Sequence, residues 1–130
     1  MPLEVHVVTP EREVWAGQAQ MVIARGVEGE VGILAGHAPL LIRLAIGPLR
    51  IQRDGEEQFA VVDGGFLHVV SAPEATRVDV LAPTASLASE IDVERERRRV
   101  ADLEARTVDK DDLEVQTELA KALARVKLRG

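Results

Sequence analysis

Apolar and polar residues alternate in short segments along the first 83 residues of the chain. Leu3, Val5 and Val7 alternate with Glu4 and His6, which is the period-2 pattern of a half-buried strand. Similar segments, bounded by turn residues, cover residues 14–16, 20–24, 30–34, 40–44, 49–53, 58–62, 66–70 and 77–81. Because a strand recurs roughly every eight to ten residues with no helix-length stretch between strands, the pattern predicts a β-sandwich or flattened barrel of about ten short strands. Asp54-Gly55, between two such segments, predicts a tight hairpin turn.

The pattern changes after Pro83. All six prolines and nine of the ten glycines lie at or before this residue, while residues 84–129 contain neither and are rich in charge. This composition predicts two helices, over residues 92–106 and from about residue 112 to about residue 128, joined by a loop over 107–111. Ser89, Glu90 and Asp92 are suited to cap the first helix. We therefore expect a β-sandwich domain over residues 1–84 and a helix-loop-helix domain over residues 85–130.

The predicted helical pair has few apolar residues with which to seal its two helices together. Its expected seam consists of Val93, Val100, Leu103, Leu119, Leu123 and Val126. Burial of six such side chains is small beside the entropy lost when some 40 residues become ordered. The pair is therefore expected to lean on the β domain or on a partner, and to adopt more than one position.

Composition excludes several classes of function. The chain has no cysteine, so it has no disulfide, thiolate nucleophile or sulfur-rich metal site. Its net charge is −6, and most of this net negative charge lies in the β domain, where acidic residues outnumber basic ones 11 to 6. Few aromatic residues and no basic patch argue against nucleic acid as a partner. No window approaches about 20 consecutive apolar residues, and the N-terminus lacks the features of a signal peptide, so we expect a soluble, unprocessed intracellular chain.

The densest motif is Gly-Glu-Val-Gly-Ile-Leu-Ala-Gly-His-Ala-Pro-Leu over residues 29–40. Its glycines are too interrupted for a phosphate-binding loop, and taken alone they suit a bulge or turn. The motif resembles the Gly-x-x-Gly-Ile-Leu-Pro-Gly-His-x-Pro-Leu segment of the epsilon subunit of bacterial and chloroplast F-type ATP synthases, with Ala35 in place of a proline. Similar segments follow that family's order at residues 7–10 (Val-Val-Thr-Pro), 62–67 (Val-Asp-Gly-Gly-Phe-Leu) and 91–95 (Ile-Asp-Val-Glu-Arg).

The resemblance implies a non-catalytic subunit of the rotary, proton-translocating ATP synthase. The β-sandwich would join the gamma subunit and the c-ring in the central stalk. The helical tail would either fold onto the sandwich or extend along gamma toward the alpha and beta subunits and oppose ATP hydrolysis. The chain would then reach the membrane only through the complex, on the cytoplasmic face of a bacterial cell membrane, with a plastid thylakoid as the less favoured alternative.

The resemblance also suggests contact residues. The motif loop, with Gly36, His37, Ala38 and Pro39, is expected to meet the c-ring. Basic residues of the tail are expected to meet acidic segments of beta, and the alternative for each is an ordinary solvated ion pair. The main basic candidates are Arg98, Arg99, Lys121 and Arg125.

A regulatory nucleotide is a further expectation, although no cofactor is required. Ile91, Asp92 and Arg95 match the Ile/Leu-Asp-x-x-Arg-Ala pattern through which some family members bind ATP. Glu96 and Asp102 oppose a triphosphate by their charge, and the alternative role for Asp92 is to cap the helix.

Two other functions are weighed against the stalk subunit. One is a free β-sandwich adaptor that senses nucleotide through its tail. The other, a small all-β enzyme or metal protein, is disfavoured because His6, His37 and His68 lie far apart and no nucleophile, base and orienting group occur together.

Overall fold

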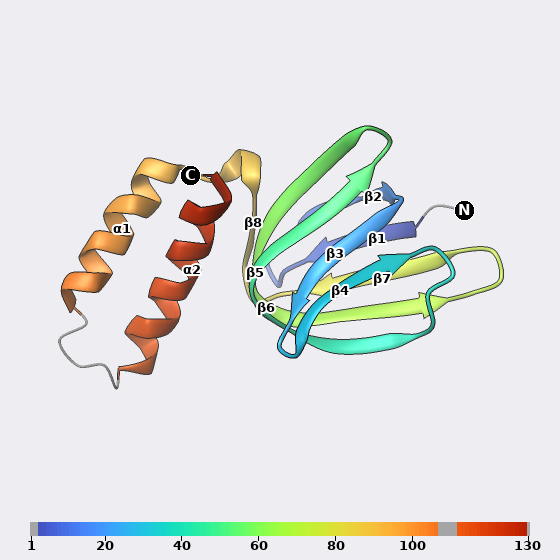
Figure 1. Ribbon diagram of the computed structural model, residues 1–130, viewed down its shortest axis with the longest axis horizontal. Coiled ribbons are helices and arrows are strands. Elements are labelled where there is room, and N and C mark those ends of the chain that lie inside the picture. Colours follow the sequence, from blue (N-terminus) through green and yellow to red (C-terminus); the bar gives the residue numbers. More distant parts are fainter. Residues whose placement is uncertain (1–2, 107–111, 130) are drawn as a thin grey trace.

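The structure is a computed structural model that describes residues 3–106 and 112–129. A β-sandwich is followed by two helices that lie side by side at one end of it, with α2 between α1 and the sandwich (Figure 1). The first strand begins at the end of the sandwich that lies away from the helices (Figure 1). The elements are β1 (Leu3–Val8), β2 (Glu13–Ala19), β3 (Met21–Gly26), β4 (Gly29–Leu34), β5 (Leu40–Arg53), β6 (Glu56–Ser71), β7 (Thr76–Leu81), β8 (Ala85–Leu87), the short 3₁₀ helix η1 (Ala88–Glu90), α1 (Val93–Arg106) and α2 (Leu113–Arg129).

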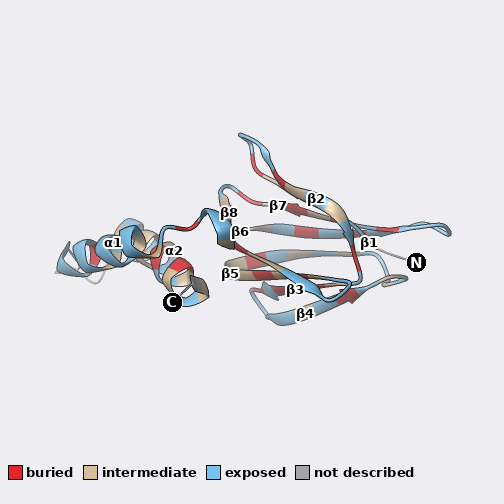
Figure 2. Ribbon diagram, turned by 90° about the horizontal axis from the view of Figure 1, so that it is seen from above, coloured by how far each residue is buried: buried red, intermediate tan, exposed pale blue. Residues whose placement is uncertain are grey.

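One hydrogen-bonded sheet, folded over on itself, makes both layers of the sandwich. Its strand order is β2-β1-β7-β6-β5-β3-β4, with β8 paired to β6, and the β1–β7 pair is parallel while the others are antiparallel. The long strands β5 and β6 pair with each other along their whole length and pass from one layer into the other. Figure 2 shows the two layers, with the helices extending from one end. The predicted β-sandwich followed by a helical pair is confirmed.

The described residues form eight strands instead of about ten. The segments predicted at 40–44 and 49–53 are one strand, β5, and those at 58–62 and 66–70 are one strand, β6. Pro48 does not break β5, because it lies where the pairing between β3 and β5 is irregular, between Leu44 and Leu49. The structure also adds β8, beyond the boundary expected at residue 84. The predicted hairpin at Asp54-Gly55 is confirmed by the pairing of Arg53 with Glu56.

The core lies between the two layers. The alternation in β1 is as predicted, with Leu3, Val5 and Val7 fully buried and Glu4 on the outer face. The other fully buried large side chains of this core come from both layers and include Val22, Ile33, Leu49, Ile51, Leu67, Val69, Val78 and Val80. The sandwich therefore has a continuous core of its own.

The Gly64-Gly65 pair fixes the path of β6 beside β7. Both residues have positive φ, +84° and +107°. A Cβ atom on Gly65 would stand 2.0 Å from the carbonyl oxygen of Leu81, so the two strands approach as closely as they do only because residue 65 has no side chain. The preceding residue, Asp63, is thereby held at a fixed point of the strand.

An aspartate caps the start of each helix, and for α1 it is Asp92, as predicted. The Arg95 N–H donates to Asp92 Oδ1 at 3.1 Å, and the Val115 N–H donates to Asp112 Oδ1 at 3.2 Å. The predicted loop over residues 107–111 lies outside the described residues. Neither described helix is long and apolar enough to cross a membrane.

The seam between the helices differs in part from the prediction. Leu103 is the buried side chain of α1, while Leu123 is 45% exposed. The expectation that Leu123 seals the helical pair is wrong, because it lines a groove toward the sandwich together with Ile46 and Pro48. The buried side chains of α2 are Ala122 and Arg125, one helical turn apart.

Candidate functional site

The candidate site is the contact between the helical tail, which comprises α1 and α2, and the end of the sandwich. The helix α2 lies against β5, β6 and η1. The helix η1 is itself tied to the sandwich, because Glu90 Oε1 accepts hydrogen bonds from Arg12 Nη2 and the Leu87 N–H, both at 2.8 Å. The tail therefore departs from the sandwich after Glu90.

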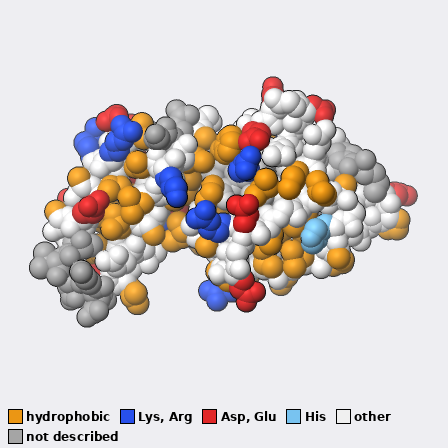
Figure 3. All heavy atoms as spheres, in the orientation of Figure 1, with side chains coloured by type: hydrophobic (Ala, Val, Ile, Leu, Met, Phe, Trp, Pro, Cys, Tyr) orange, Lys and Arg blue, Asp and Glu red, His pale blue; other side chains and the backbone are white. Residues whose placement is uncertain are grey.

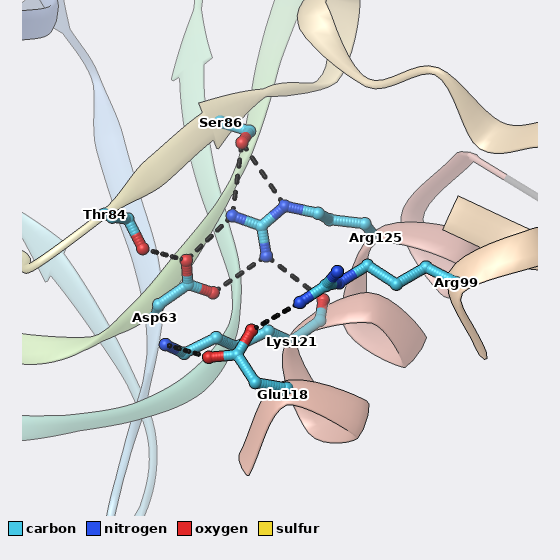
Figure 4. A network of polar contacts seen from close by, with 7 residues as sticks. All are labelled: Asp63, Thr84, Ser86, Arg99, Glu118, Lys121 and Arg125. Atoms are coloured by element: carbon cyan, nitrogen blue, oxygen red, sulfur yellow. Dashed lines mark hydrogen bonds and ion pairs between the residues drawn. The ribbon is translucent and has the colours of Figure 1, made fainter. Parts of the chain in front are cut away.

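A buried ion pair joins α2 to β6 at this contact (Figure 4). Arg125 Nη1 donates to Asp63 Oδ1 and Nη2 donates to Oδ2, each at 2.8 Å. The Arg125 side chain is 11% exposed and the Asp63 side chain is 2% exposed. This two-bonded fork matches the planar guanidinium to the planar carboxylate and fixes their relative orientation.

Neighbouring groups satisfy the remaining hydrogen-bond donors and acceptors of Arg125 and Asp63. The Thr84 hydroxyl donates to Asp63 Oδ2, and the Asp63 N–H donates to the Thr84 carbonyl at 3.0 Å. Ser86 Oγ accepts from Arg125 Nε at 3.3 Å and from Nη2 at 3.2 Å, and the Lys121 carbonyl accepts from Nη1 at 3.1 Å. Each nitrogen of the guanidinium thus has an acceptor, which a buried charge requires.

The charge state of Arg125 follows from these contacts. Burial lowers the pKa of Arg125, but the hydrogen bond and charge of Asp63, together with the charges of Glu96 and Glu118, outweigh this effect and raise the pKa above its ordinary value. The guanidinium stays charged in its buried position.

A second ionic cluster ties the two helices to each other. Glu118 accepts a hydrogen bond from Arg99 of α1 at 2.9 Å and another from Lys121 at 3.3 Å. Together with Asp63, Glu96 and other neighbours, these side chains line a polar cavity of about 260 Å³. The cavity thus lies where α1, α2 and β6 meet.

The apolar part of the contact is loosely packed. A groove of about 330 Å³ runs between α2 and β5, with Ile46 and Pro48 on one side and Leu123 and Leu128 on the other. Figure 3 shows hydrophobic side chains, with basic side chains among them, at the surface along this junction. Because much of this apolar surface remains open to solvent, it contributes less than the same area in a close-packed core.

The Glu118 cluster predicts that the stability of the tail depends on pH. The Arg99 hydrogen bond lowers the pKa of Glu118; burial opposes this effect, and Lys121 adds to it. A lowered pKa in the folded state adds stability above the unfolded pKa of about 4.3, and this stability is lost as the pH falls through the folded pKa.

We therefore expect the Glu118→Gln variant to be less stable than the wild-type chain at neutral pH. Urea unfolding should show this difference in unfolding free energy shrinking between about pH 6 and about pH 3. A difference that stays constant over that range would show that Glu118 adds no charge-dependent stability.

The motif loop lies at the end of the sandwich opposite the helices (Figure 1). The Gly36 N–H donates to Thr76 Oγ1 at 2.7 Å, and Ser71 Oγ donates to the His37 carbonyl at 2.6 Å. Gly36, Ala38 and Pro39 are exposed, and His37 is half-buried. The loop is thus held in place and open to a partner, and its contact with the c-ring stays a prediction.

The three residues proposed for nucleotide do not form one site here. Ile91 is buried, Asp92 caps α1, and Arg95 is exposed. None of them lines the polar cavity. The structure gives Asp92 its alternative role as a helix cap, and ATP binding stays a prediction.

The four basic candidates have different surroundings. Arg98 is exposed and has no ion pair with another described residue, whereas Arg99 and Lys121 share Glu118. Arg125 points into the molecule and is bound to Asp63, so in this position it does not present its charge to a partner subunit.

Sequence reasoning missed Asp63, Thr84 and Ser86 as parts of this site. One signal was available, because Asp63 is an acid that follows the apolar run Ala60-Val61-Val62 within a strand. A carboxylate in such a place is seldom buried without a charged partner.

Comparisons with known proteins agree with this architecture. The family model described as "ATP synthase, Delta/Epsilon chain, beta-sandwich domain" matches residues 2–90. The chain is 44% identical over 128 residues to the ATP synthase epsilon chain of Thermobifida fusca, covering 96% of this chain and 90% of the relative. It is 43% identical over 131 residues to that of Halorhodospira halophila, again covering 96% and 90%.

Chains in solved ATP synthase structures have a similar fold. A chain in the cryo-EM structure of the Euglena gracilis mitochondrial ATP synthase, described as OSCP/F1/c-ring, is 25% identical with a TM-score of 0.78, covering 98% of this chain and 79% of that one. A chain in the Tetrahymena thermophila central stalk/c-ring structure, at 16% identity and a TM-score of 0.58, shares the fold. Since the family model spans the sandwich and the curated relatives also span the helical tail, the chain belongs to the family of ATP synthase epsilon chains.

Proposed function

We propose that this chain is a non-catalytic subunit in the central stalk of a bacterial proton-translocating ATP synthase. It couples the rotation of gamma to that of the c-ring and opposes ATP hydrolysis through its helical tail. The observation that carries this proposal is the 44% identity to an epsilon chain over 96% of the chain, sandwich and tail together.

The sandwich suits the role of an anchor. Its core is continuous, and its motif loop is held by Ser71 and Thr76 at the end away from the tail. A rigid body can transmit torque, because interdigitated side chains in a close-packed interior resist deformation. In this assignment the sandwich binds gamma and the c-ring, and the chain meets the cytoplasmic face of the membrane only through them.

The tail suits the role of a movable element. It is attached to the sandwich through one face of α2, with an open groove on one side and a polar cavity on the other. A helical pair held by few contacts shifts position when a partner binds one position better than the other. In the extended position the tail reaches the alpha and beta subunits and opposes hydrolysis.

Co-purification tests the assignment to the stalk against the free nucleotide-sensing adaptor. A tagged copy of the chain, expressed in its own bacterium, is expected to be recovered from membranes in stoichiometric complex with gamma, alpha and beta. Recovery of a solitary chain under conditions that keep the rest of the complex together would overturn the proposal.

Removal of the tail tests the inhibitory role. A chain that ends at Glu90 keeps β8 and the Arg12–Glu90 contact, so the sandwich is expected to assemble into the complex as before. We expect the ATP hydrolysis rate to rise about fivefold or more, in the range of ordinary coupling free energies. An unchanged rate in a fully assembled complex would refute inhibition by the tail.

A further inference from the structure

We propose that the Asp63–Arg125 ion pair is the latch that holds the helical tail on the sandwich. Among the ion pairs between described residues, it is the one that joins a helix of the tail to a strand of the sandwich. Its residues are 62 positions apart in the sequence, so the pair exists only when the tail is docked.

The rest of the contact is too loose to set the position of α2. Ala122 is the one buried apolar side chain that α2 contributes among its described residues, and Leu123 is nearly half exposed beside the open groove. Apolar contacts of this kind tolerate sliding and rotation, because they have no preferred direction.

The ion pair fixes the orientation of α2 on the sandwich, which the apolar contacts do not. Both guanidinium bonds to Asp63 measure 2.8 Å, and such a fork is satisfied in a single orientation. Lys121 lies one helical turn before Arg125 and carries a charge of the same sign, but an ammonium cannot form the fork. The latch therefore selects one register of α2 on the sandwich.

Contacts within the sandwich keep Asp63 in position to bind Arg125. The Asp63 carboxylate accepts from Thr84, and its backbone is fixed by the hydrogen bond to Thr84 and by the bend of β6 at Gly64-Gly65. When the tail leaves, water solvates both charges, which offsets much of the attraction lost between them. Release is therefore reversible, whereas an apolar contact of the same size would resist it.

Hydrogen exchange on the full chain tests the latch. In Asp63→Asn, the neutral amide leaves the Arg125 charge uncompensated, and we expect the amides of α2 to exchange about 10- to 100-fold faster. The amides of β1 and β7 should keep their wild-type rates. Asp102→Asn is the matched control, because Asp102 forms an exposed pair with Arg106 on α1, and it should leave α2 unchanged.

A second variant tests whether the effect of Asp63→Asn comes from the broken ion pair or from disruption of the sandwich. Arg125→Gln breaks the same pair from the tail side and leaves every residue of β6 intact, and it should produce the same selective change in α2. Wild-type exchange of α2 in both variants would overturn the latch. Equal acceleration of α2, β1 and β7 in both would also overturn it, since unfolding would then be global.

That the latch regulates ATP hydrolysis is a separate claim, which rests on the proposed function. It is tested by the hydrolysis rate of the assembled complex. In the assembled complex, Asp63→Asn should lower the ATP hydrolysis rate, because a released tail spends more time extended. Selective acceleration of α2 with an unchanged hydrolysis rate would support the latch and contradict inhibition by the tail. Unchanged exchange would refute the latch whatever the hydrolysis rate.

Discussion

Replacing Arg125 with alanine is expected to lower the unfolding free energy of the isolated chain by about 3 kcal/mol, which urea unfolding measures. In the docked chain the variant leaves the Asp63 carboxylate, which is 2% exposed, without its counter-charge, and water solvates that carboxylate only when the tail undocks. Breaking a buried pair from one side costs about 3 to 5 kcal/mol, and the lower end applies because Thr84 still donates to Asp63. Arg97→Ala is the control, since Arg97 pairs with Glu94 on an exposed face of α1 and should change stability by less than about 0.5 kcal/mol.

The double variant separates the ion pair from ordinary packing. In Asp63→Ala combined with Arg125→Ala, no charge is left uncompensated, so the total loss should be smaller than the sum of the two single losses by about 1 to 3 kcal/mol. Strict additivity, or an Arg125→Ala chain as stable as the Arg97→Ala control, would show that the pair does not hold the tail.

Gly65→Ala is expected to lower the unfolding free energy about as much as Arg125→Ala does. The reason is a steric clash with the backbone of the neighbouring strand. The new Cβ would stand 2.0 Å from the Leu81 carbonyl oxygen and 2.8 Å from Ala82 Cα, so β6 and β7 would have to separate. We expect a loss of about 3 kcal/mol or more in unfolding free energy.

Gly36→Ala is the matched comparison for this variant. Gly36 also has a positive φ, +84°, but no atom lies within 4 Å of the position of its Cβ. It should cost only the backbone strain, about 1 to 2 kcal/mol. Equal losses of unfolding free energy in the two variants would mean that the close approach of β6 to β7 adds nothing to the cost of Gly65→Ala.

Gly65 lies in a segment, β6, whose course the sequence predicted only in part. The alternation in β1, the Asp54-Gly55 hairpin and the aspartate at the start of α1 are local signals, and the structure agrees with them. The glycine pair at residues 64–65 suggested a break between two strands, yet it lies inside β6. A strand that passes between two layers needs such freedom in mid-course, and local pattern does not distinguish a bend from an end.

The strand β8 escaped prediction for a different reason. It has three residues, Ala85–Leu87, all of them half-buried, so it carries no period-2 pattern to recognise. Its place in the sheet comes from its pairing with residues 60–62 of β6. A strand this short is defined by its partner.

The latch escaped prediction because its two halves are far apart in the chain. Arg125 is one of several basic residues in a charged helix, and nothing in the helix itself indicates which of them turns toward the sandwich. Asp63 is an acid beside an apolar run, a signal that the sequence prediction did not use, and that run does not indicate which base is its partner. The four basic candidates, interpreted alike from the sequence, divide in the structure into one exposed residue, two that share Glu118, and one that is buried.

The chain combines an anchor, the sandwich, with a reversible switch, the helical tail. The sandwich has a continuous core and keeps the motif loop in place, and the tail is held through one buried ion pair and a loosely packed groove. A small difference in contacts then decides between the docked and the extended tail, which is the property that a regulatory element requires.

The ATP hydrolysis rate of the assembled complex, measured with three versions of this chain, is the decisive test of a tail that inhibits when released from the sandwich. We expect one order of rates, with the highest rate for the chain that ends at Glu90, an intermediate rate for the wild-type chain, and the lowest rate for Asp63→Asn. Equal rates for all three, with each version present in the complex at full stoichiometry, would contradict it.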